Sequence, residues 1–129
     1  MNIVERAELA VKLKSTGYNC CQAVVAALSD LVDCDVDTLN AAAAGFCVGM
    51  GDMTATCGAL IGAGIIAGLL TRGNGTVRYT RAISEEFRTL CGATYCHELK
   101  SIKDGRPLCP CSECVRNGVL AFGKVFDMQ

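Results

Sequence analysis

The chain has 129 residues, of which 51% are hydrophobic and only 19% are charged, and its formal net charge is −1. This composition is sufficient for one buried core and predicts a single domain over residues 1–129. Lysine and arginine form no dense cluster, so we expect no nucleic-acid partner, because such proteins carry a basic face.

The start of the chain contains no apolar signal core, which argues against export. The longest apolar run, residues 57–70, is shorter than the roughly 20 residues that span a bilayer, and it contains four glycines. We therefore expect a cytoplasmic protein without membrane insertion.

Apolar residues at helical spacing predict a first helix over residues 3–14, which Gly17 would stop. Asn19 followed three residues later by Gln22 has the form of a capping box. This pair predicts a second helix over residues 20–31.

A short third helix is expected at residues 36–44, and the glycine-punctuated segment 45–54 predicts a tight loop. Thr56 is expected to cap the apolar helix 57–70. Glycine inside an exposed helix costs stability, so the glycines here indicate that another helix lies very close. They are Gly58, Gly62 and Gly64.

Thr76 is expected to cap a further helix that runs to residue 90, and Gly92 interrupts the chain after it. A short helix at 94–100, a loop and a final helix at 112–126 complete the prediction. No run of residues alternates between apolar and polar side chains with the period of two that a strand shows. The sequence therefore predicts an all-α fold: a compact bundle of six or seven helices with a buried Gly/Ala-rich central helix and no sheet.

Ten cysteines are the most informative feature of the composition. In a reducing compartment such a number indicates metal ligation or thiol redox chemistry rather than structural disulfides. Free cysteine is also a common buried residue, and we interpret Cys21, Cys34 and Cys47 as core side chains.

Four cysteines fall at predicted helix starts, namely Cys20, Cys57, Cys96 and Cys111. A helix N-terminus presents unpaired N–H groups, which stabilise a thiolate and lower its pKa. Because exchange and ligation both need sulfurs at short range, we expect these four to converge on one site.

A second candidate site is the cysteine-rich segment near the end of the chain, which includes a CxxC at 111–114. Such a set of thiols could close a zinc site. Beside it, His97 would be a base or ligand, or simply a solvated histidine. The cysteines of this alternative site are Cys91, Cys96, Cys109, Cys111 and Cys114.

Five stretches match a known family in order and spacing: residues 19–24 (NCCQAV), 45–51 (GFCVGMG), 57–62 (CGALIG), 87–99 and 111–115 (CSECV). The chain thereby resembles the redox-active protein family named after its C, GCAxxG, C and C pattern. The resemblance implies redox activity carried by four cysteines.

Residue by residue, the family's four cysteines correspond to Cys20, Cys57, Cys96 and Cys111, and Cys109 or Cys114 competes for the last place. The family pattern has glycine where this chain has Cys47, and commonly lacks cysteine at positions 91 and 114. These departures leave open whether further thiols join the site.

The features together favour a small redox protein that acts through the four cysteines, by thiol–disulfide exchange or electron transfer. Whether it is an enzyme, a thiol-based oxidoreductase, stays open. An iron–sulfur cluster on the same thiolates is the main alternative, and zinc on the C-terminal cysteines is the other. The redox partner is unknown, and the apolar composition also suits a homodimer.

Overall fold

Helices form almost all of the regular structure in the computed structural model, which describes residues 1–129. The all-α prediction with six or seven helices is confirmed. The seven α-helices are α1 (Ile3–Ser15), α2 (Cys20–Ala27), α3 (Val36–Ala43), α4 (Gly58–Thr71), α5 (Thr76–Cys91), α6 (Cys96–Leu99) and α7 (Cys111–Val125).

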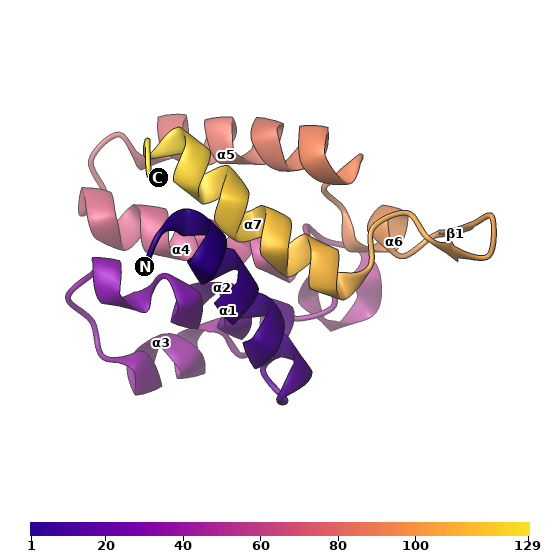
Figure 1. Ribbon diagram of the computed structural model, residues 1–129, viewed down its shortest axis with the longest axis horizontal. Helices are drawn as coiled ribbons and strands as arrows, with labels where there is room; N and C mark the ends of the chain where they lie inside the picture. Colours follow the sequence, from indigo (N-terminus) through magenta and orange to yellow (C-terminus); the bar gives the residue numbers. More distant parts are fainter.

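The helices pack chiefly as α1 on α7, α2 on α4 and α5 on α7, while α4 also contacts α5 and α7. The two termini lie together at one end of the bundle, where the Ile3 N–H donates to the Gln129 carbonyl at 2.7 Å (Figure 1). The short helix α6 and a hairpin project from the other end (Figure 1).

That hairpin corrects the prediction of a fold without any sheet. Strands β1 (Ile102–Lys103) and β2 (Arg106–Pro107) pair antiparallel around Asp104 and Gly105. Both turn residues have positive φ, 57° and 83°. Asp-Gly is a strong signal for a two-residue hairpin turn.

Helix α2 ends earlier than the predicted residue 31. The chain continues from Ala27 through Leu28 into a 3-10 turn, η1 (Ser29–Leu31). The Ser29 hydroxyl donates to the Ala26 carbonyl at 2.8 Å, which offers the backbone an alternative to the α-helical ladder.

Two predicted caps are wrong. Cys57, rather than Thr56, is the N-cap of α4, and Gly75, rather than Thr76, is the N-cap of α5. Thr76 is the first residue of α5, and its hydroxyl hydrogen-bonds with that of Thr71 at 2.6 Å. The Asn19–Gln22 capping box of α2 is present as predicted.

The close approach of α4 to another helix occurs at Gly62. A Cβ at this position would lie 2.9 Å from the Cys21 carbonyl oxygen and 3.2 Å from the Cβ of Val24. Both neighbours belong to α2, where six of the eight residues are buried, a larger fraction than the seven of fourteen in α4. Helix α4 is buried as expected, but α2 is the more deeply buried of the two.

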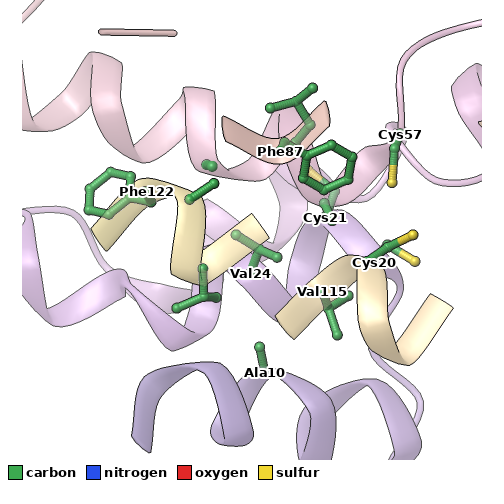
Figure 2. Close-up of a cluster of buried hydrophobic side chains, with 14 of the residues drawn as sticks. Ala10, Cys20, Cys21, Val24, Cys57, Phe87, Val115 and Phe122 are labelled. Atoms are coloured by element: carbon green, nitrogen blue, oxygen red, sulfur yellow. The ribbon is translucent and has the colours of Figure 1, made fainter. Parts of the chain in front are cut away.

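One hydrophobic cluster runs through the bundle. Phe122 of α7 lies toward one end of it, and Cys20 and Cys57 lie beside each other at the opposite end (Figure 2). No helix combines the length and the hydropathy needed to cross a bilayer.

Candidate functional site

A cavity of about 80 Å³ lies where the starts of α2, α4, α6 and α7 meet. Five of the ten cysteines and two lysines contribute to its walls. The lining residues are Lys14, Cys20, Cys47, Val48, Cys57, Gly58, Cys96, Lys100 and Cys111. The structure therefore brings together all four cysteines expected at one site, while their role as catalytic residues or ligands stays a prediction.

Cys20 is positioned by the capping box at the start of α2. The Asn19 side chain accepts from the Gln22 N–H at 2.9 Å, and the Gln22 side chain accepts from the Asn19 N–H at 3.1 Å. The Asn19 amide also donates to the Ala44 carbonyl at 3.0 Å. These bonds tie the start of α2 to the end of α3 and fix Cys20 at the first position of its helix.

Cys57 and Cys96 are held near each other by an isolated antiparallel bridge between Thr56 and Tyr95. The Cys57 N–H donates to the Thr94 carbonyl at 2.8 Å, and the Cys96 N–H donates to the Ala55 carbonyl at 3.0 Å. The segments before α4 and α6 are thus paired, although they are 39 positions apart.

Two glycines allow the backbone to close around the cavity. Gly49, at φ 53°, begins the π-helical turn η2 (Gly49–Met53), and a Cβ there would lie 2.7 Å from the Cβ of Cys96. A Cβ at Gly58 would overlap the Phe46 carbonyl oxygen. The predicted tight loop therefore packs directly on the thiol site.

Cys20 and Cys111 form a hydrogen-bonded thiol pair. Hydrogen bonds from Cys20 and from Lys100 lower the pKa of Cys111 to about 5. The same bond to Cys111, together with burial, raises the pKa of Cys20. Within this pair, Cys111 is the thiolate and Cys20 is the protonated donor.

Lys100 supplies the positive charge of the site. Burial alone would lower the pKa of Lys100. The hydrogen bond to Cys111 and the charges of the nearby thiols have the opposite effect, and together they raise the pKa of Lys100 above its usual value. Lys100 therefore stays protonated beside the Cys111 thiolate.

The other two cysteines of the cavity differ from each other. The hydrogen bond from Cys114 lowers the pKa of Cys57 to about 7 against the effect of burial, and the backbone N–H groups of Ala59 and Leu60 act in the same direction. Burial raises the pKa of Cys96. The expectation that a helix start acidifies each thiol holds for Cys57 and Cys111 and is wrong for Cys20 and Cys96.

The five cysteines of the alternative C-terminal site divide between two places. Cys96 and Cys111 line the cavity, whereas the sulfurs of Cys91, Cys109 and Cys114 lie within 4.8 Å of one another in a separate buried cluster. The CxxC at the start of α7 is therefore split, because its two thiols belong to different groups. All ten cysteines are free thiols.

Three lining residues were missed or misread in the sequence. Cys47, interpreted as a core residue, is only partly buried and lines the cavity. Lys100 follows Cys96 by four positions, which is about one helical turn. This spacing indicates that the two side chains share one face of a helix, so Lys100 could have been linked to Cys96 from the sequence. Lys14 lies on α1 and has no sequence signal that links it to the cysteines. His97 is exposed, which agrees with a solvated histidine.

The largest cavity, about 520 Å³, lies between α4 and α5 and contains no thiol. Its walls are mostly apolar, with residues such as Leu60, Ile65 and Ile83, and none of its lining residues is ionisable.

Comparison with known proteins gives one match. The family model described as "Putative redox-active protein (C_GCAxxG_C_C)" matches residues 18–124, a range that contains all ten cysteines. No curated protein and no solved structure matches the chain.

Proposed function

We propose that this chain, which belongs to the C_GCAxxG_C_C family of redox-active proteins, performs thiol–disulfide exchange with Cys111 as the attacking thiolate and Cys20 as its partner. The observation that carries the proposal is the hydrogen-bonded Cys20–Cys111 pair beside Lys100 in a cavity that Cys57 and Cys96 also line. A nucleophilic thiol needs a lowered pKa and access, and Cys111 has both, since it is only half-buried.

The reaction would begin with attack of the Cys111 thiolate on one sulfur of a disulfide substrate. The substrate S–S bond breaks, one substrate thiolate leaves and takes up a proton, and a mixed disulfide forms on Cys111. Cys20 then loses its proton and attacks the Cys111 sulfur, which releases the second substrate thiol. The substrate is reduced to two thiols, and the protein is oxidised to a Cys20–Cys111 disulfide.

The burial of the two thiols supports this division of roles. Cys20 is only 6% exposed, so a substrate sulfur reaches Cys111 more readily than Cys20. The buried thiol is well placed to resolve a mixed disulfide on its hydrogen-bonded neighbour. Lys100 keeps Cys111 ionised and able to attack.

Glutathione disulfide mixed with the reduced protein under anaerobic conditions tests the proposal. We expect the wild type to release two glutathiones per protein, and the Cys20→Ser variant to stop at a glutathione adduct on Cys111 that mass spectrometry detects. Cys111→Ser should react at least about tenfold more slowly, because it lacks the thiolate. Cys34→Ser, which lies outside the cavity, is the matched control. Exchange by Cys111→Ser at the wild-type rate would contradict the proposal.

An iron–sulfur cluster is the second candidate, and one observation favours it. Four thiols on one cavity are the donor set that such clusters use, and Lys14 and Lys100 would offset their negative charge. The cluster would supply one-electron transfer, and Cys20, Cys57, Cys96 and Cys111 would hold it.

Anaerobic purification with an absorption spectrum, iron analysis and a free-thiol count separates the two candidates. Iron-dependent visible absorbance that disappears in Cys57→Ser and Cys96→Ser would establish the cluster. A colourless, iron-free protein with all thiols titratable would favour thiol exchange.

A further inference from the structure

Three cysteines outside the cavity form a compact cluster, which we call the thiol trio: Cys91, Cys109 and Cys114. Their sulfurs all lie within 4.8 Å of one another. The residues are nearly inaccessible, with exposed fractions of 6%, 4% and 0%.

The trio joins three separate parts of the chain. Cys91 is the last residue of α5, Cys109 lies between β2 and α7, and Cys114 is in the first turn of α7. The Cys109 N–H donates to the Leu99 carbonyl at 2.9 Å. This hydrogen bond holds the segment after the hairpin against the end of α6. The clustering of these sulfurs therefore depends on how the hairpin and α7 are placed.

The spacing of the sulfurs fits a single metal ion. A thiolate binds a metal such as zinc at about 2.3 Å, so three thiolates around one three-coordinate ion lie about 4.0 Å apart. The sulfurs of the trio, within 4.8 Å of one another, would have to approach by at most about 0.8 Å to bind one ion together.

We propose that Cys91, Cys109 and Cys114 form a three-thiolate site for a soft, thiophilic cation, and that Cu(I) is the ion it fits. Thiolates select soft ions, and no carboxylate or histidine belongs to the cluster, which disfavours magnesium, calcium and manganese. Structural zinc almost always takes four ligands, and an iron–sulfur cluster held by cysteine also uses four. A set of three ligands fits a three-coordinate ion better than either.

One contact beside the trio suits a metal-bound thiolate. The Asn117 amide donates to the sulfur of Cys91 at 3.4 Å, as an outer hydrogen bond to a metal-bound thiolate would. An ion at this position would also join the end of α5 to the start of α7.

Titration with Cu(I) in the presence of a competing chromophoric Cu(I) chelator, under anaerobic conditions, tests the proposal. The protein used is the Cys20→Ser/Cys111→Ser double variant, so that the exchange pair does not contribute. We expect one equivalent of Cu(I) to bind, and the further change Cys109→Ser to abolish this binding. The same titration with Zn²⁺ is the second arm, and retention of Zn²⁺ without Cu(I) would overturn the assignment.

X-ray absorption on the Cu(I)-loaded wild type and double variant guards against variants that fail to fold. In the double variant we expect three sulfur ligands at about 2.3 Å and no nitrogen or oxygen ligand. Cys34→Ser is the matched control, because Cys34 lies outside both the cavity and the trio, and it should leave this spectrum unchanged. Two or four sulfur ligands, or loss of Cu(I) in Cys34→Ser, would overturn the three-thiolate site. Neither result bears on glutathione exchange by Cys20 and Cys111.

Discussion

Cys20 and Cys111 each occupy the first position of a helix, yet their pKa values shift in opposite directions. The start of α2 is closed by the Asn19–Gln22 capping box, whereas α7 has no side-chain cap. Cys111 also has Lys100 as a hydrogen-bonding partner. At the residue scale, the neighbours of a thiol decide its reactivity more than its position on a helix does.

Replacing Lys100 with methionine tests this electrostatic account. The pKa of Cys111 should rise, so its alkylation by iodoacetamide at pH 6 should slow by about two- to tenfold. At pH 9 the wild type and the variant should react at similar rates, because Cys111 is ionised in both. Quantitative mass spectrometry of the Cys111 peptide provides the rates.

Lys12→Met is the matched control, since Lys12 is also a lysine but is exposed and lies outside the cavity. Its effect on Cys111 should be small. Equal slowing by the two variants would mean that general charge, rather than the contact with Lys100, sets the pKa of Cys111.

The candidate thiols could be predicted from the sequence, but their individual states could not. Helix-start positions and the family resemblance both selected Cys20, Cys57, Cys96 and Cys111. Which thiol of a pair ionises depends on the Cys20–Cys111 and Cys57–Cys114 contacts, and these join residues that are far apart in the chain.

At the scale of the elements, the crossing of α2 and α4 depends on the absence of a side chain at Gly62. We expect Gly62→Ala to lower the free energy of unfolding by about 1–3 kcal/mol, because the new Cβ would press on the Cys21 carbonyl. Urea denaturation followed by circular dichroism measures the change.

Gly64→Ala is the matched control on the same helix. Its Cβ would meet only the Thr80 methyl at an ordinary 3.6 Å, so the gain in helix propensity should stabilise the protein by up to about 1 kcal/mol. Destabilisation of both variants by the same amount would show that the effect belongs to the helix and not to the crossing.

The ion pair between Arg6 and Asp30 joins α1 to the turn η1. Arg6 is only 5% exposed, and it donates to both Asp30 and the Ala27 carbonyl. The hydrogen bond from Arg6 holds the pKa of Asp30 below its usual 3.8. A carboxyl with a lowered folded-state pKa stabilises the fold above its unfolded pKa, and this contribution is lost as the pH falls through the folded value.

Asp30→Asn should therefore destabilise the protein at pH 7 by about 1 kcal/mol, a modest value because water screens the exposed carboxylate. The gap in stability between variant and wild type should begin to close as the pH falls below about 4, where the unfolded carboxyl takes up a proton, and should vanish only below the lower folded-state pKa. Thermal melts across this pH range measure it. A gap that stays constant down to pH 2 would assign the effect to packing instead.

The elements show which local signals were reliable. The capping box at Asn19 and the glycine-rich loop were correctly interpreted, because their chemistry acts over a few residues. The caps assigned to Thr56 and Thr76 were wrong by one residue. Cys57 precedes α4 at φ −55° and ψ 134°, and Gly75 precedes α5 at φ 68°, a left-handed conformation that favours glycine. The Asp104–Gly105 turn is a local hairpin signal, but its strands of two residues each are too short to show the alternation of a strand.

At the scale of the whole molecule, the chain separates its thiols into a cavity group and a buried trio. Cys111 and Cys114 are three positions apart in α7 yet belong to different groups. Sequence spacing could not predict this division, because it depends on where the hairpin returns Cys109 and where α5 ends at Cys91. Cys57 of the cavity and Cys114 of the trio are neighbours, and Cys114 lowers the pKa of Cys57, so the two groups are linked through this pair.

The central claim is that Cys20 and Cys111 are the exchanging pair. Titration of the reduced protein with less than one equivalent of a disulfide oxidant, followed by acid quenching and peptide mapping, tests it most directly. The account predicts that the first disulfide to form joins Cys20 to Cys111, while Cys34 and the thiol trio stay reduced. A first disulfide within the trio, with Cys20 and Cys111 still free, would contradict it.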